Sequence, residues 1–128
     1  ALLAFEEANK IKPTFWQSLN NQALVLYELH EINKAILIWE KVLKIEPDAE
    51  PILALAAAKY KTNMKNDLSI EFAKKALLKK PNYVNEHYQK EQLWGKKLRM
   101  AAKKLLNDPR LQEAVANAIT HSTLKNGL

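Results

Sequence analysis

Apolar residues recur along this chain at helical spacing, and prolines interrupt that pattern at a fixed interval. Pro13, Pro47 and Pro81 stand 34 residues apart, and an amphipathic stretch precedes each of them. A proline steers the residue before it away from helical dihedral angles, so each of the three predicts the end of a helix. The sequence therefore predicts a helical unit that recurs along the chain.

Side chains at equal distances before these prolines are alike, which supports a repeat. The residues twelve and five positions before each proline are small or β-branched: Ala1, Ala35 and Ser69, then Ala8, Val42 and Ala76. A second apolar line recurs at the same interval: Leu19, Ala23 and Leu26, then Leu53, Ala57 and Tyr60. Steps of three and four residues return to one side of a helix, so each line predicts one helix face. Each unit is therefore expected to hold two helices, joined by the polar segments 29–33 and 63–67.

The period fades after Pro81, because Val115 stands where the next proline would fall. After Pro81, four apolar residues have the spacing of one helix face: Trp94, Leu98, Ala101 and Leu105. One long helix through Gly95 and a helix pair broken at Gly95 fit this spacing equally well. Asp108 and Pro109 predict the start of a last helix, whose expected apolar stripe is Leu111, Val115 and Ile119. Such a helix would cover the open end of a stack of repeats.

The proline-closed helix–turn–helix unit resembles the tetratricopeptide repeat (TPR), most clearly in the segment NKAILIWEKVLKIEPDAE (33–50). The resemblance covers a solenoid at 1–107, made of a half repeat (1–15), two repeats (16–49 and 50–83) and a degenerate repeat (84–107). A capping helix (108–120) and a frayed tail (121–128) follow. The segment 93–115 is also similar to the ends of some cyanobacterial TPR proteins. The chain departs from the family pattern at Gln22, where the family prefers leucine. The resemblance implies an all-α, right-handed superhelix.

Composition agrees with an all-α chain and excludes several kinds of chemistry. The 128 residues suit one domain, and two glycines are too few for a turn-rich β protein or a phosphate-binding loop. The absence of cysteine excludes disulfides and thiolate catalysis. His30, His87 and His121 each stand alone in their segments, so no metal site is expected. We therefore expect no enzyme activity, no cofactor and no metal.

Two expectations concern the context of the chain. No apolar run approaches the roughly 18–20 residues that span a bilayer, so no transmembrane segment is expected. The chain begins with Ala1 inside an apolar-periodic stretch, which is the pattern expected of a fragment. Apolar surface on such a truncated repeat would allow two copies to dimerise by stacking.

Charge is distributed unevenly along the sequence. Residues 1–58 carry five lysines against eight acidic residues, whereas residues 59–110 carry fourteen basic against five acidic residues. The densest basic run holds Lys96, Lys97, Arg99, Lys103 and Lys104. These residues are candidates for contact with nucleic acid or an anionic membrane surface. Nucleic acid is the less favoured partner, because no exposed aromatic residues alternate with the basic ones to stack on bases.

The resemblance also implies a function, because the first helix of each TPR pair lines a concave face that holds a peptide or a partner helix. The positions that match this groove are Gln17, Asn20, Asn21, Leu24, Tyr27, Ala54, Ala58, Lys61, Thr62, Asn85, Tyr88, Gln89 and Gln92. Leu24 and Ala58 stand where TPR proteins that grip chaperone termini need polar groups. The sequence thus predicts a noncatalytic module for a protein or peptide partner. The alternatives are a basic docking surface or a structural piece of a longer solenoid.

Overall fold

A computed structural model of the chain describes residues 15–63 and 66–122. Within these ranges it contains seven α-helices, two 3₁₀-helices and no strand, so the all-α prediction is confirmed. The elements in chain order are α2 (Trp16–Glu28), α3 (Ile32–Ile45), α4 (Ala49–Lys61), α5 (Asn66–Lys79), η1 (Pro81–Val84), α6 (Glu86–Glu91), α7 (Lys96–Leu106), η2 (Pro109–Leu111) and α8 (Gln112–His121). The half repeat expected at 1–15, apart from Phe15, and most of the expected tail lie outside the described residues.

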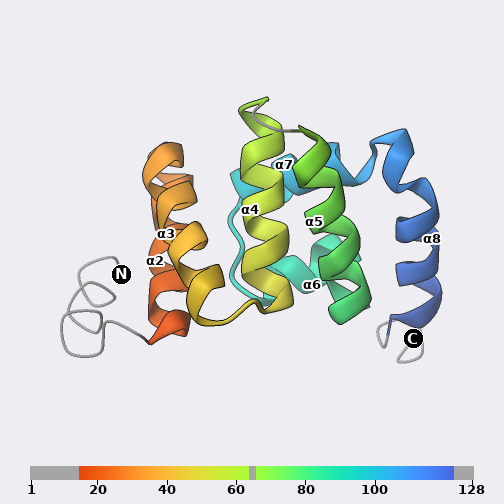
Figure 1. The fold of residues 1–128 in the computed structure, drawn as a ribbon, viewed down its shortest axis with the longest axis horizontal. Coiled ribbons are helices and arrows are strands. Elements are labelled where there is room, and N and C mark those ends of the chain that lie inside the picture. The colour runs from red at the N-terminus through yellow and green to blue at the C-terminus, as the bar shows by residue number, and fades with distance from the viewer. Residues whose placement is uncertain (1–14, 64–65, 123–128) are drawn as a thin grey trace.

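Two helix pairs form one side of the molecule. α2 packs against α3 and α4 against α5, while α3 joins the pairs by packing on α4 (Figure 1). The expected proline stops are confirmed, because α3 ends at Ile45 and α5 ends at Lys79, each two residues before a proline. Pro51 lies in the first turn of α4, where a missing N–H leaves no bond unmade. Asp48 is the N-cap residue of α4, although its side chain makes no capping hydrogen bond.

Three turns between helices share one backbone device. His30, Asn63 and Leu93 adopt left-handed conformations with φ of 67°, 61° and 70°. After α2, Glu31 N donates to Leu26 O, and after α6, Trp94 N donates to Gln89 O; both bonds span five residues. This is how a helix commonly ends before a sharp turn. The segment at Gly95 is therefore a break between α6 and α7, and the alternative of one long helix is wrong.

The predicted inner faces of the helix pairs form the core. The repeating positions on α3 and α5 are all fully or almost fully buried: Ala35, Trp39, Val42, Ser69, Ala73 and Ala76. Trp39 Nε1 donates to Asn20 Oδ1 at 2.9 Å, and its ring lies 6.1 Å from that of Tyr27. Because a buried polar atom needs a partner, this bond fixes how the first pair packs.

α7 does not extend the row of helix pairs. It turns back, packs on both α4 and α2, and lies behind α4 in the view of Figure 1. Its predicted apolar face is confirmed, since Leu98, Ala101 and Leu105 are buried. With α3, α5 and α7 around it, α4 is buried continuously from Pro51 to Lys59. α4 is thus the central helix of the described chain.

α8 packs against α5 and η1, at the end of the molecule opposite α2 (Figure 1). The stripe expected for it is partly wrong. Leu111 is fully buried and Val115 half-buried, but Ile119 is 52% exposed, and Ala118 is buried instead. The chain passes from the 3₁₀ turn η2 into α8. Because a 3₁₀ turn has fewer residues per turn than an α-helix, it changes which of the following residues lie on the side that packs on the core.

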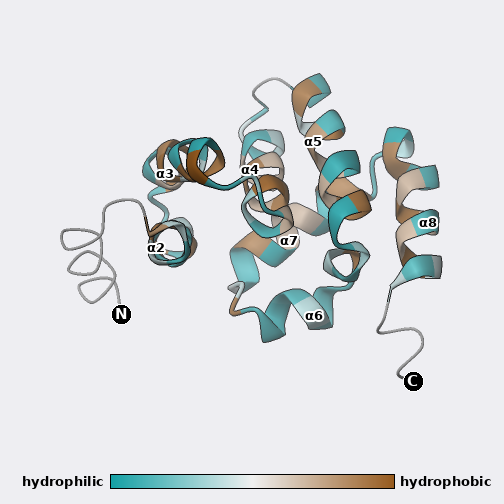
Figure 2. Cartoon of the chain, turned by 60° about the horizontal axis from the view of Figure 1, so that its bottom comes forward, coloured by the Kyte–Doolittle hydropathy of each residue, from teal (hydrophilic) through white to brown (hydrophobic). Residues whose placement is uncertain are grey.

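Hydropathy along the ribbon follows this packing. Hydrophobic and hydrophilic stretches alternate along α3, α5 and α8, as amphipathic helices on a core require, whereas α6 is mainly hydrophilic (Figure 2). Within the two described ranges, no helix has the length and apolar character needed to cross a bilayer.

Replacing Trp39 by phenylalanine is expected to lower the free energy of unfolding by roughly 2–4 kcal/mol, because it leaves Asn20 Oδ1 unpaired and a gap in the core. Urea denaturation followed by circular dichroism measures this loss. Trp16→Phe is the matched control, since Trp16 is only half-buried at the start of α2. Equal losses in the two variants would contradict the role given to the Trp39 hydrogen bond.

Candidate functional site

The face of α2 and α4 that was expected to form an open groove is covered by α7 of the same chain. Leu24, Tyr27, Ala54 and Ala58 are buried, with Ala54 and Ala58 fully so. Burial of the apolar face of α7 is favourable because it removes apolar surface from water. The small alanine side chains of α4 allow α7 to approach closely. These four positions are therefore core residues in this structure, and the surface they were expected to offer is not open.

The remaining groove candidates differ in solvent exposure. Gln17, Lys61 and Asn85 are exposed, Asn21, Thr62, Tyr88 and Gln92 are half-buried, and Asn20 and Gln89 are buried. Several of them serve local structure. Asn85 Oδ1 accepts from Tyr88 N and so caps α6, Gln89 Nε2 donates to Tyr83 O at 2.7 Å, and Thr62 Oγ1 donates to Lys59 O. The structure does not gather these side chains into one surface.

The first turn of α7 is capped by a carboxylate that is distant in sequence. Glu28, the last residue of α2, accepts hydrogen bonds from Lys97 N and Leu98 N, both at 3.0 Å. Helix N-termini carry unpaired N–H groups and a partial positive charge, so a carboxylate stabilises them. Lys97 Nζ adds contacts to Glu28 O and His30 Nε2. A β-carbon at residue 95 would overlap the Glu28 side chain, which explains Gly95.

A polar network around Glu50 attaches the segment before α7. Trp94 Nε1 donates to Glu50 Oε2 at 3.0 Å, and Asn20 and Tyr83 also hydrogen bond to this carboxylate. Asn20 in turn accepts from Trp39, so the network joins α2, α3, α4, η1 and the segment before α7. Burial is the main cause that raises the pKa of Glu50, and the three hydrogen bonds oppose that rise. Trp94 is buried against Tyr83, with ring centroids 5.8 Å apart.

The far end of α7 is held by a second polar cluster. Tyr60 Oη donates to Asp108 Oδ2 at 2.8 Å, and the Arg110 guanidinium binds Asp108 and also Asp67 at the start of α5. Hydrogen bonds from Arg110 hold the pKa of Asp108 well below its usual range. The chain between α7 and α8 is therefore fixed to α4 and α5.

The basic candidates occupy the outer side of α7. Lys96, Lys97, Lys103 and Lys104 are exposed, whereas Arg99 is half-buried. Arg99 donates from Nη1 to Trp94 O at 2.6 Å and from Nε to Glu86, so it serves the fold. The four lysines share one exposed helix side, as their spacing predicts.

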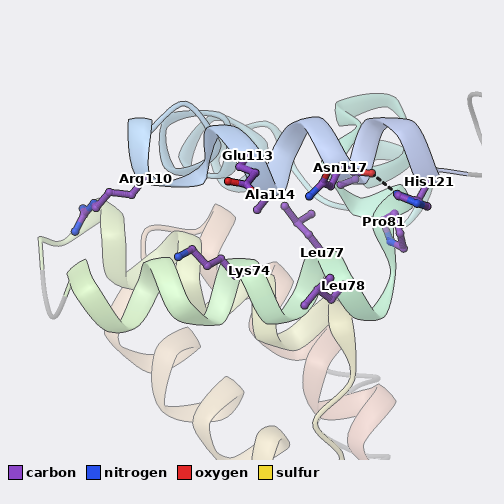
Figure 3. A pocket seen from close by; sticks show the side chains of 10 residues that line it. Lys74, Leu77, Leu78, Pro81, Arg110, Glu113, Ala114, Asn117 and His121 are labelled. Carbon is purple, nitrogen blue, oxygen red and sulfur yellow. Dashed lines mark hydrogen bonds between the residues drawn. The ribbon is translucent and has the colours of Figure 1, made fainter.

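A cleft that the sequence did not reveal lies between α5 and α8. Arg110 binds Asp67 at one end of the two helices, and Ser122 Oγ donates to Asn82 Oδ1 at the other, so they run in the same direction. Between these ends they leave a cleft of about 700 Å³ (Figure 3). Its lining residues are Lys74, Leu77, Leu78, Pro81, Arg110, Glu113, Ala114, Asn117, Ala118 and His121. Leu77 points into the space between the helices in Figure 3.

The sequence pattern did not indicate this cleft. Leu78 is 82% exposed on α5, but the pattern alone does not distinguish an isolated surface leucine from one at the edge of a cleft. The described residues contain no cluster of three or more histidine, aspartate or glutamate side chains that could hold a metal ion. No protein-family model, curated protein or solved structure matches the chain.

Gly95→Ala is expected to destabilise the protein by roughly 1–2 kcal/mol, because the new methyl group displaces Glu28 from the first turn of α7. The loss should shrink in a Glu28→Ala background, where the cap is already absent and space is free. A double-mutant cycle from urea denaturation measures this coupling. Additive effects of the two substitutions would contradict it.

The stability of the wild type and of Glu50→Gln should diverge with pH. A carboxyl group whose pKa is raised by folding contributes stability that is fully present below its ordinary value of 4.5 and is lost as the pH rises through the folded-state pKa. Lowering the pH from neutral toward that value should therefore favour the wild type over Glu50→Gln. Urea denaturation across this range tests the prediction, and parallel profiles would contradict it.

Proposed function

We propose that this chain is a noncatalytic helical-repeat module of the TPR type, and that it binds a protein segment in the cleft between α5 and α8. The repeat assignment is supported by the 34-residue period, by the two stacked helix pairs and by the third turn of the same geometry at Leu93. In this proposal the described pairs belong to a right-handed superhelix whose inner face is filled by α7.

The observation that carries the choice of site is that the cleft is open while the face of α2 and α4 is closed. A peptide on that closed face would have to displace α7 and break the Glu28 cap and the Trp94–Glu50 bond. The α5–α8 cleft needs no such rearrangement. Its size of about 700 Å³ lies within the range of sites that hold ligand-sized groups.

The lining of the cleft indicates the chemistry of its occupant. Leu77 and Leu78 of α5, with Pro81 of η1, form one apolar wall of the cleft. Ala114 and Ala118 of α8 contribute only small side chains to the opposite wall, so apolar side chains of a partner fit between the two. A leucine that is exposed in the free protein gains about 1.5–3 kcal/mol when a partner buries it fully. The cleft therefore suits a segment that presents apolar anchors at helical or extended spacing.

The polar residues around the cleft favour an acidic partner. The cations Lys74 and Arg110 lie along it, against Glu113 as the one carboxylate of the lining. Arg110 is held by Asp108 and Asp67, and Lys74 is paired with Glu71 at 3.5 Å, an exposed ion pair worth little and easily exchanged. An acidic side chain of the partner would replace Glu71 on Lys74. We therefore assign the cleft to an apolar segment flanked by acidic residues.

Leu78→Glu is expected to weaken capture of the partner by at least about tenfold, because it removes apolar contact and adds a like charge. Affinity capture from a lysate of the source organism identifies the partner, and titration of the purified pair measures the loss. Leu37→Glu is the matched control, since Leu37 is a 66% exposed leucine on α3 and does not line the cleft.

Both variants change exposed side chains and should keep the circular dichroism spectrum of the wild type. Loss of the partner in Leu78→Glu alone supports the cleft as the binding site. Equal capture by the wild type and both variants would show that the cleft is not the site.

A further inference from the structure

The outer side of α7 combines positive charge with an exposed apolar side chain. Lys96 precedes Met100 by one helical turn, and Lys103 and Lys104 follow it by one turn, so Met100 lies among lysines. The helix contains no acidic residue, and Met100 is 53% exposed. This outer face of α7 is opposite the buried Leu98 and the alanines that follow it.

The lysines of this face are available for a partner. Within the described residues, Lys96, Lys103 and Lys104 form neither an ion pair nor a side-chain hydrogen bond. The acidic side chains that hydrogen bond to α7 are already committed. Glu28 caps the helix, and Glu86 pairs with Arg99. The outer face therefore presents uncompensated positive charge.

A second exposed apolar residue stands where the backbone does not favour it. Leu93 is three residues before Lys96, has a φ of 70° and is 77% exposed. A leucine in the left-handed region is strained, whereas asparagine and histidine adopt it more readily. The two equivalent turns follow that preference, with His30 and Asn63. Packing does not explain Leu93, because most of its side chain contacts solvent.

We propose that the outer face of α7, together with Leu93, docks onto an anionic phospholipid bilayer. The free lysines would lie against the lipid phosphates and carboxylates, and Leu93 and Met100 would enter the boundary between head groups and acyl chains. Both features of the surface then have a role: the positive charge gives attraction, and the apolar side chains give insertion.

Nucleic acid accounts for less of this surface. A phosphate backbone would use the lysines but would leave Leu93 and Met100 without a contact. α7 has no aromatic residue on which a base could stack. The α5–α8 cleft lies on other elements, so this docking does not depend on the proposed peptide site.

The test is flotation of the purified chain with vesicles of phosphatidylcholine alone and with vesicles that also contain about 30% phosphatidylserine, at about 100 mM salt. We expect binding to the anionic vesicles only. The triple variant Lys96→Gln/Lys103→Gln/Lys104→Gln should partition at least about tenfold more weakly, since each lysine near such a surface contributes about fivefold.

A charge-matched control separates this face from net charge. Lys41→Gln/Lys44→Gln/Lys75→Gln removes the same charge from exposed lysines on α3 and α5, and it should bind like the wild type. The double variant Leu93→Asn/Met100→Gln keeps every lysine and relieves the strained turn, so the fold is retained. It should lose most of the vesicle binding if the apolar side chains insert.

Insertion has a direct spectroscopic readout. The chain has no cysteine, so Met100→Cys offers one site for an environment-sensitive fluorophore. A blue shift on adding anionic vesicles supports insertion. Equal partitioning of the two lysine variants would overturn the proposal. So would tighter binding to a mixed-sequence oligonucleotide that Leu93→Asn/Met100→Gln leaves unchanged, because that result assigns the face to nucleic acid.

Discussion

The position of α7 rests on the partly buried carboxylate of Glu50. Removing a carboxylate from water is costly, and that cost is offset only when donors surround it. Here the donors come from Asn20, Tyr83 and Trp94, which belong to three separate parts of the chain. The same carboxylate therefore ties the first helix pair, the turn after α5 and the segment before α7 to α4. Glu28 then fixes the direction in which α7 leaves this point, by capping its first turn.

Closure by α7 decides which surfaces the molecule offers. The inner face of the helix pairs is buried by α7, so its alanines belong to the core and are not open to a partner. Two of the surfaces that the described residues leave open lie outside this closed face. One is the apolar cleft between α5 and α8, and the other is the basic side of α7. They differ in chemistry, so each fits its own class of partner.

Much of the local structure follows from the chain pattern. The prolines marked the ends of α3 and α5, and the repeating apolar positions marked the buried sides of α3, α5 and α7. The final helix shows where the pattern fails. The residues of α8 that lie on the core side depend on the 3₁₀ turn that precedes the helix, and the apolar spacing does not predict that turn. The candidate groove failed for a different reason, since nothing local to Ala54 or Ala58 says which helix will cover them.

The sequence by itself determined the ends of α3 and α5 and the inner faces of α3, α5 and α7, because these depend on contacts between residues a few positions apart. Only the tertiary structure decided that α7 folds back on α4, that Leu78 borders a cleft and that Lys96, Lys103 and Lys104 have no ion-pair partner among the described residues. Those outcomes depend on residues 40 to 70 positions apart, such as Ser122 with Asn82 and Leu98 with Glu28. Such pairings are selected by the free energy of the whole packed chain, and helical periodicity carries no record of them.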